Sequence, residues 1–307
     1  MNNSNFLDSP FKRVIEVVDK SVSTDDVGND IKVVDQNNFT RIVFSGGGVK
    51  GLSFIGALRA LHKKNMLKNL NTFVGTSAGA LLACMCVLSY TPKEMKNKVL
   101  SIDFPTLVDF HLENFLELCG FDNGKGIETS IKEIIKEKTG NENITFQELY
   151  NKTQKRLVIT AVTLFECTIN YFSHTTHANM PVYLAIRMSM SIPYFFAPVQ
   201  YEGKFYIDGG CIDNYPIAFE KHNDKTIGLS ISTNHKISPS LNMENLTLSI
   251  FNCLLFKSKK IQLNNNCKSI VINIDQYNSV DFNLDDKAKK NIIKYGYDIV
   301  AKELLNY

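Results

Sequence analysis

Short apolar runs alternate with longer amphipathic stretches from Thr40 onward, and this pattern predicts strands that alternate with helices. The apolar runs predict strands at residues 41–44, 71–74, 156–164, 168–173, 204–207, 226–232 and 269–274. After the first strand, a helix is predicted by apolar side chains spaced three apart on one face: Leu52, Ile55, Leu58 and Leu61. Such alternation is typical of an α/β fold with a mainly parallel central sheet, covered by helices on both faces.

Further helices are predicted at residues 78–90, 182–190 and 285–305. Thr91 and Pro92 predict the start of another helix, because proline is favoured at the first helical position. Thr145 and Glu148 have the spacing of a capping box and predict a short helix that begins beside them.

The first 38 residues are polar and irregular, and we interpret them as an N-terminal extension that is partly helical near residues 12–20. We expect one domain at 39–307, with a motif-bearing core at 40–224 and a C-terminal part at 225–307. The longest apolar run, 78–90, is shorter than the ~20 residues of a membrane span, and no signal peptide is visible. These features predict a cytoplasmic protein.

The composition is that of an ordinary globular protein, with 44% hydrophobic and 21% charged residues among 307. This apolar content excludes disorder of the whole chain. The 34 Lys and Arg residues against 31 Asp and Glu give a net charge of +3, so we expect no nucleic-acid partner. Seven cysteines without a Cys-x-x-Cys pair indicate free thiols rather than a disulfide framework or a zinc site.

A cluster of glycines follows the first predicted strand. Gly46, Gly48 and Gly51 match the letters G-x-G-x-x-G of a dinucleotide-binding turn. That fold needs an acidic residue about 20 positions later, whereas Ser45–Lys93 contains no Asp or Glu. A phosphate-binding loop would need Gly, Lys and then Ser or Thr at its end, whereas here Gly51 is followed by Leu52. The cluster is therefore either a tight connection or a turn whose backbone N–H groups stabilise negative charge.

A serine follows the second predicted strand in the pattern G-x-S-x-G, at residues 75–79. In such a turn the serine lies between a strand and a helix in a strained backbone, and side chains at Gly75 or Gly79 would clash. The N-terminus of the following helix adds positive potential beneath the serine oxygen. Ser77 is therefore a candidate nucleophile, although the pattern alone also occurs by chance.

A serine hydroxyl is a weak nucleophile and needs a base, which is most often a histidine oriented by an acid. The chain has six histidines, none of them in a recognisable late-chain catalytic loop: His62, His111, His174, His177, His222 and His235. His174 and His177 as a metal pair lack further ligands. The histidines therefore do not identify the base.

Asp208, Gly209 and Gly210 follow a short predicted strand, and an isolated Asp-Gly-Gly is usually a turn. Here it comes after the glycine cluster and the serine motif, and the three in this order resemble the patatin-like phospholipase family. The stretch 187–198 resembles the family's sequence before the aspartate, and Asn214 and Pro216 resemble its continuation. The resemblance covers about three-fifths of the chain, and it implies an α/β fold and an enzyme that hydrolyses acyl esters of lipids.

The resemblance implies a catalytic dyad, with Ser77 as the nucleophile and Asp208 as the base that takes its proton and later activates water. It also implies an oxyanion hole in the glycine loop, formed by Gly46, Gly47, Gly48, Lys50 and Gly51. Lys50 matches the family's basic position, where it either anchors the loop or adds positive charge near the oxyanion. The turns are supported by Gly75, Gly79, Gly209 and Gly210. A dyad accounts for the missing histidine and needs no cofactor or metal.

On the substrate side, the resemblance implies a phospholipid or another acyl lipid, cleaved by a phospholipase A or lysophospholipase activity. Eight apolar side chains between Phe104 and Phe121 predict a core helix, which we favour slightly, or an acyl-chain wall or lid. Residues 251–260 join aromatic side chains to lysines and predict a solvated face or a peripheral contact with an anionic membrane. No calcium-binding loop pattern occurs in the sequence.

Three alternatives stay open at this point. A Ser-His-Asp esterase would act on soluble esters, and a catalytically silent protein would bind lipids on the same fold. An intact Ser77 and Asp208 argue against the silent protein. Acyl transfer to another lipid would share the acyl-enzyme step with hydrolysis, so the sequence does not separate the two.

Overall fold

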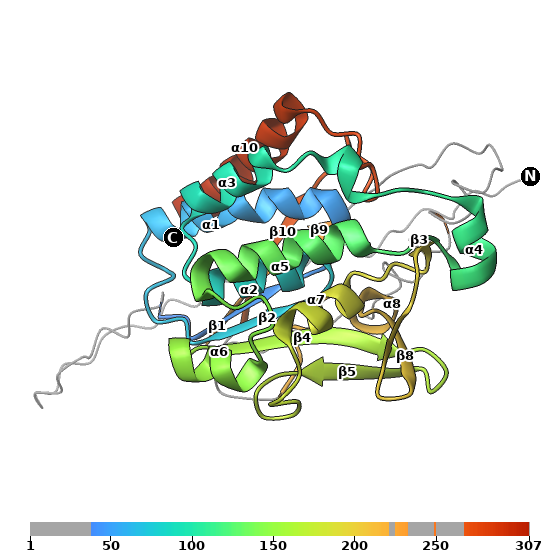
Figure 1. Ribbon diagram of the computed structural model, residues 1–307. Helices are drawn as coiled ribbons and strands as arrows, with labels where there is room; N and C mark the ends of the chain where they lie inside the picture. Colours follow the sequence, from blue (N-terminus) through green and yellow to red (C-terminus); the bar gives the residue numbers. More distant parts are fainter. Residues whose placement is uncertain (1–37, 221–224, 233–248, 250–266, 307) are drawn as a thin grey trace, which may run out of the picture. The chain divides into compact units, whose positions relative to one another are not determined.

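The computed structural model describes residues 38–220, 225–232, 249 and 267–306, and these form a mixed, mostly parallel β-sheet with surrounding helices (Figure 1). The sheet has eight strands in the order β10-β9-β1-β2-β4-β8-β7, with β5 also paired to β4. Its parallel strands are β1 (Arg41–Phe44), β2 (Thr72–Gly75), β4 (Arg156–Thr163), β9 (Thr226–Ser232) and β10 (Cys267–Asn273). Its antiparallel strands are β5 (Thr168–Phe172), β7 (Val199–Tyr201) and β8 (Lys204–Asp208). Two short strands pair separately, β3 (Gly120–Asp122) and β6 (Tyr194–Phe196).

Helices of ten or more residues are α1 (Ser53–Lys63), α2 (Ala78–Val87), α3 (Pro92–Ser101), α5 (Lys125–Thr139) and α10 (Asp286–Glu303). Shorter helices are α4 (Leu112–Leu118), α6 (Phe146–Thr153), α7 (Val182–Ser189) and α8 (Gly210–Asp213). Three 3₁₀ turns complete the described elements: η1 (Gly48–Leu52), η2 (Phe104–Leu107) and η3 (Leu304–Asn306).

Side chains of the central strands are buried on both faces of the sheet, because successive residues of a strand point to opposite sides. One set joins the main core with the helices: Ile42, Phe44, Phe73, Leu157 and Ile159. The intervening strand residues form a smaller core with Ile217, which follows α8: Val43, Val74 and Val158. Tyr171 of β5 packs against this core, as do Tyr215 and Phe219 after α8. Burial on both faces explains why β1, β2 and β4 are continuous apolar runs.

The structure confirms the predicted α/β fold and most of the predicted elements, with boundaries that shift by a few residues. Both predicted helix starts are present as capping boxes. Thr91 pairs with Glu94 at the start of α3, and Thr145 pairs with Glu148 at the start of α6. The six described cysteines are free, as the sequence indicated: Cys84, Cys86, Cys119, Cys167, Cys211 and Cys267.

The apolar stretch 104–121 is not a core helix, so the prediction that we favoured slightly is wrong. It consists of η2, an extended segment, α4 and the start of β3, and no residue of α4 is buried. The helical segments η2 and α4 are short and are separated after Leu107, so Phe104 is the one apolar side chain of this stretch that is buried in the core. Helix α5, by contrast, was not predicted, and its Ile127, Ile131 and Ile134 are buried.

Several predictions lie outside the described residues: the partly helical extension at 1–37 and the cluster of aromatic side chains and lysines at 251–260. Within the described ranges, no helix combines the length and the apolar character needed to span a bilayer.

Candidate active site

The glycine loop joins β1 to η1, and two of its backbone N–H groups have no acceptor among the described residues. Two hydrogen bonds anchor the loop: the Gly46 N–H donates to the Asn214 carbonyl at 3.0 Å, and the Val49 N–H donates to the Ser279 carbonyl at 2.9 Å. Gly48 has a positive φ of 55°, and a side chain there would run into the Ser279 carbonyl, so only glycine fits. Within the described part of the chain, no acceptor binds the N–H of Gly47 or Gly48. These two donors can therefore bind an anionic oxygen from outside the loop.

Ser77 occupies the turn between β2 and α2 in the strained backbone that the sequence predicted. Its φ of 54° and ψ of −127° are costly for a non-glycine residue, at about 1–3 kcal/mol. A side chain at Gly75 would run into the Gly79 carbonyl, and one at Gly79 would lie 2.5 Å from the Ser45 carbonyl oxygen. The two glycines therefore let the turn pack tightly and hold Ser77 at the end of β2.

The strand pairing brings Asp208 to Ser77. Strand β5 pairs with Ile159 and with Ala161 along one edge of β4. On the other edge, Ile159 pairs with Gly75 of β2 and Ala161 pairs with Asp208 of β8, so β2 and β8 share this edge. Because Ile159 and Ala161 are two residues apart, the end of β2 and the end of β8 lie about 7 Å apart along β4. Asp208 and the turn that carries Ser77 therefore lie next to each other along the same edge of β4.

Asp208 is fully buried, and its protonation is tuned by this environment. Burial raises the pKa of Asp208 to about 7, while the nearby Ser77 hydroxyl and the Gly210 N–H oppose the rise. Oδ1 accepts from the Gly210 N–H at 2.7 Å, whereas Oδ2 is buried and has no hydrogen bond of normal geometry to any described residue. Loose contacts of this kind are common in catalytic groups before substrate binds.

Ser189, the last residue of α7, contributes a contact that the sequence did not reveal. Its buried Oγ accepts the Ser77 N–H at 2.8 Å, and the nearby Ser191 carbonyl accepts the Asp208 N–H at 2.9 Å. The end of α7 thus holds the backbone of both Ser77 and Asp208. These residues lie inside the stretch 187–198 that resembled the family, but no residue pattern there indicated which serine would contact the nucleophile turn.

Lys50 is fully buried, and its amine has no hydrogen-bond partner among the described residues. Burial lowers the pKa of Lys50 to about 8, and the charge of Asp275 opposes the decrease. Its backbone N–H donates to Gly47 O at 3.2 Å, and its side chain does not line the cavity beside Ser77. Of the two roles left open by the sequence, this placement argues against a positive charge beside the oxyanion.

An apolar cavity of about 110 Å³ lies beside Ser77. Gly48, Gly51 and Ser77 form its polar end, and the remaining walls come mainly from α2, α5 and η2 with Met190, Ile192, Phe196 and Phe282. Phe104 and Leu107 line it, so part of the stretch 104–121 does form a wall of the cavity. No described histidine lines it, whereas His222 and His235 lie outside the described residues.

The chain matches known proteins over most of its length. A family model described as patatin-like phospholipase matches residues 42–219. Uncharacterized protein R571 of Acanthamoeba polyphaga mimivirus is 29% identical over 89% of this chain and 96% of that protein. Probable lipid hydrolase 463L of Invertebrate iridescent virus 6 is 32% identical over 61% of this chain and 66% of that protein. The crystal structure of VipD from Legionella pneumophila superposes with a TM-score of 0.59 at 16% identity, over 88% of this chain and 67% of that one.

The VipD match shows a shared α/β fold. The chain belongs to the patatin-like phospholipase family, because the family model covers more than half of it. This confirms the resemblance read from the three motifs and the expected class of enzyme, a carboxylic ester hydrolase.

Proposed function

We propose that the protein is a serine lipid acyl hydrolase of the phospholipase A or lysophospholipase type, with Ser77 as nucleophile and Asp208 as base. The observation that carries this proposal is a strained serine and a buried aspartate with a pKa of about 7, at the polar end of an apolar cavity. A base with a pKa near the working pH is in the useful protonation state and still accepts a proton readily. We further propose that residues 39–307 form the catalytic domain and 1–38 an extension to it.

In the first half of the reaction, Asp208 takes the proton of the Ser77 hydroxyl while Oγ attacks the ester carbonyl. The N–H groups of Gly47 and Gly48 stabilise the resulting oxyanion, and each such donor contributes about 3 kcal/mol. Collapse of the tetrahedral intermediate breaks the ester C–O bond. Protonated Asp208 then gives its proton to the departing alcohol oxygen, and the acyl group stays on Ser77.

In the second half, Asp208 takes a proton from water, and the hydroxide attacks the acyl-enzyme carbonyl. The second intermediate collapses, Oγ leaves and regains the proton from Asp208, and the carboxylic acid is released. Each proton that Asp208 accepts is returned within the same half, so the cycle balances and uses no metal or cofactor. The apolar walls of the cavity support this role, because they offer an acyl chain a dry environment.

The Ser-His-Asp alternative has less support from the described residues. His174 stacks on Tyr150 with ring centroids 3.8 Å apart, His177 packs on Phe172, and His111 pairs with Asp109 on the surface. His62 is also exposed. Asp208 already supplies a buried group with a suitable pKa beside Ser77, so we favour the dyad.

The first test is hydrolysis of phosphatidylcholine vesicles by the purified protein, followed by mass spectrometry of the lipid products. We expect equal amounts of free fatty acid and lysophospholipid, because water resolves the acyl-enzyme. Transfer of the acyl group to an added lipid alcohol, with no fatty acid released, would indicate a transferase instead. Release of a phosphorylated head group, or no reaction, would contradict the proposal.

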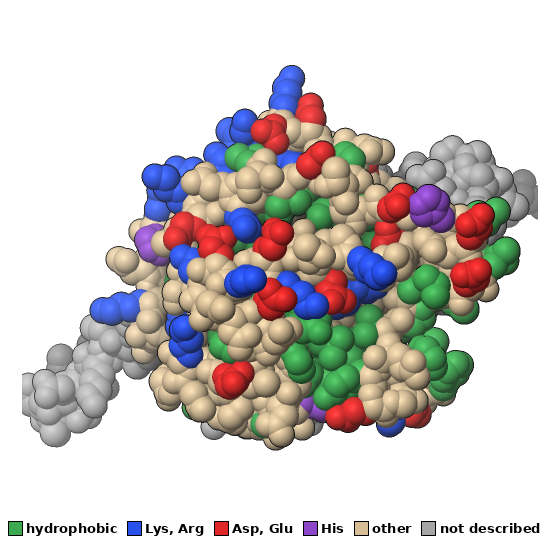
Figure 2. Space-filling view, in the orientation of Figure 1, with side chains coloured by type: hydrophobic (Ala, Val, Ile, Leu, Met, Phe, Trp, Pro, Cys, Tyr) green, Lys and Arg blue, Asp and Glu red, His purple; other side chains and the backbone are tan. Residues whose placement is uncertain are grey.

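We also propose that α4 contacts the surface of the membrane that supplies the substrate. Hydrophobic side chains gather over α4 in Figure 2, and Leu112 and Leu116 are 68% and 78% exposed. They lie one helical turn apart, so they share a face. Glu113 and Glu117 on the same helix make an uncharged membrane surface a better fit than an anionic one. The continuity of this helix with Phe110, which lines a cleft beside the cavity, supports a lipid contact.

Replacing Leu112 and Leu116 together by serine should lower the rate on phosphatidylcholine vesicles about tenfold, because two leucines contribute roughly 1.5–3 kcal/mol each when fully buried and less at a surface. Hydrolysis of a soluble ester should stay unchanged, since α4 has no buried residue that the fold needs. Phe165→Ser, at an equally exposed residue outside α4, is the matched control. Equal loss on both substrates would contradict a membrane role for α4.

A further inference from the structure

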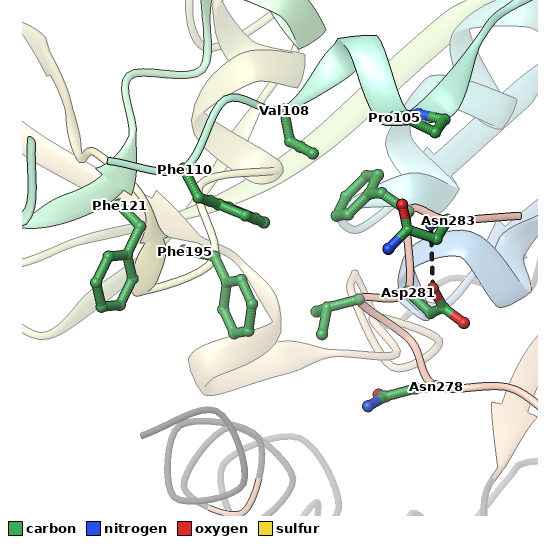
Figure 3. Close-up of a pocket in the computed structure, with 10 residues that line it drawn as sticks. Pro105, Val108, Phe110, Phe121, Phe195, Asn278, Asp281 and Asn283 are labelled. Atoms are coloured by element: carbon green, nitrogen blue, oxygen red, sulfur yellow. Dashed lines mark hydrogen bonds between the residues drawn. The ribbon is translucent and has the colours of Figure 1, made fainter. Parts of the chain in front are cut away.

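An open cleft of about 750 Å³ lies next to the cavity that holds Ser77 (Figure 3). Phe282 lines both spaces, and the neighbouring residues Phe195 and Phe196 line the cleft and the cavity respectively. The cavity alone, at about 110 Å³, is smaller than the ~300–1,000 Å³ typical of sites that enclose a ligand. The part of a lipid that does not enter the cavity therefore needs another place, and the adjoining cleft has a suitable volume.

The cleft has an apolar end and a polar end. Figure 3 shows Phe110, Phe121 and Phe195 on one side, with Val108 beside them, and Asn278, Asp281 and Asn283 on the other. The rings of Phe110 and Phe195 meet edge to face, with centroids 6.0 Å apart. A groove divided in this way matches a molecule with a hydrocarbon chain at one end and a polar group at the other.

The polar end carries one charged side chain, the carboxylate of Asp281. Its Oδ1 accepts the backbone N–H of Asn283 at 3.0 Å, which fixes the carboxylate. No Lys or Arg is found among the described residues that line the cleft. A head group that ends in an ammonium ion would be attracted to Asp281, whereas a purely anionic head group would be repelled and would find no cation there.

We propose that this cleft binds the leaving half of a two-chain phospholipid, with the second acyl chain at the Phe110 end and a head group bearing an ammonium ion at the Asp281 end. This inference rests on the proposed function, because it assigns the first acyl chain to the cavity beside Ser77. It makes the cleft the source of selectivity for diacyl phosphatidylcholine over both lysophosphatidylcholine and phosphatidylglycerol.

Binding to the inactive Ser77→Ala protein tests the cleft without turnover. The ligands are dihexanoyl phosphatidylcholine, dihexanoyl phosphatidylglycerol and hexanoyl lysophosphatidylcholine, kept below their micelle concentrations and measured by calorimetry. We expect the diacyl choline lipid to bind about tenfold more tightly than either of the others. Against the lysophospholipid this factor reflects the second acyl chain, and against phosphatidylglycerol it reflects one charge contact in a partly exposed cleft.

Two substitutions in the Ser77→Ala background separate the two ends. Phe110→Ala should reduce the preference for two chains about fivefold and leave the head-group preference unchanged, because Phe110 is 47% exposed and its ring contributes only part of the apolar surface. Asp281→Asn should reduce the head-group preference about fivefold and leave the chain preference unchanged. Phe165→Ala and Asp109→Asn are matched controls, since both residues are exposed and neither lines the cleft.

Equal affinities for the three ligands would overturn the inference, and so would equal effects of the cleft and control substitutions. Hydrolysis of p-nitrophenyl butyrate by the wild-type protein tests the proposed function separately, because this ester has neither a second chain nor a head group. An active enzyme with equal lipid affinities would contradict the cleft alone. An inactive enzyme that still binds with the expected preferences would contradict the proposed chemistry alone.

Discussion

Ser77→Ala is expected to lower the rate of fatty-acid release at least about 10⁴-fold, because the reaction then lacks the oxygen that forms the acyl-enzyme. The glycine loop and the cavity stay intact, so the variant should still bind lipid. The measurement is the initial rate on phosphatidylcholine vesicles, together with labelling by a fluorophosphonate reagent. The wild-type protein should carry the label on Ser77, and Ser77→Ala should take up none.

The strained backbone of Ser77 gives this prediction a second readout. Ser77→Gly should be as inactive as Ser77→Ala but more stable than it by about 1 kcal/mol, since glycine adopts a positive φ without steric cost. Ser89→Gly is the matched control, because Ser89 also has a positive φ, of 60°, but is exposed and does not line the cavity. It should keep full activity. An active Ser77→Ala enzyme, or a label on another residue, would contradict the mechanism.

Asp208→Asn should lower the rate about 10⁴-fold as well, because the amide cannot accept the proton of Ser77. The amide keeps the shape of the carboxylate, and its oxygen can still accept the Gly210 N–H, so the turn should stay folded. The measurement is the initial rate on a soluble ester and on vesicles. Loss on both substrates would identify a chemical defect rather than a defect in lipid binding.

The pH profile of the wild-type enzyme should report the pKa of Asp208 directly. A base works when it is deprotonated, so the rate should rise with pH and level off above about 7. Two pH units below that value, about 1% of the maximal rate should remain. Asp213→Asn is the matched control. Burial also raises the pKa of Asp213, but its carboxylate accepts the Tyr171 hydroxyl at 2.8 Å, so this variant should keep the same profile.

Asp208 should also affect stability, with a definite sign. Its pKa is raised in the folded state, so folding favours the protonated carboxyl. The resulting contribution of Asp208 to the free energy of unfolding is fully present below its unfolded pKa, near 4, and is lost as the pH rises through about 7. Asp208→Asn removes the ionisable group and should raise the free energy of unfolding at pH 8 by a few kcal/mol, on the order expected for a buried charge, with little effect at pH 4. A flat pH profile of the wild type, or an equally stable variant at pH 8, would contradict the role of Asp208.

Local structure and family membership could be predicted from the order of residues alone. Runs dominated by apolar residues identified β1, β2, β4 and β9, because strands buried on both faces carry few polar side chains. Glycine spacing identified the two turns, since glycine adopts a positive φ without steric cost and permits close backbone contacts, as at Gly48 and Gly79. Such constraints act over a few residues, so they are visible in the order of residues along the chain.

The tertiary structure alone determined how distant segments meet. Ser77 and Asp208 are 131 positions apart, and they approach only because β2 and β8 share one edge of β4. The pKa of Asp208 follows from burial by all the surrounding segments, and the contact from Ser189 depends on where α7 ends. The stretch 104–121 has the apolar content of a core helix, yet its position beside the cavity leaves α4 exposed. The burial, contacts and electrostatic environment of a site depend on residues that are far apart in the chain, so no local sequence pattern can predict them.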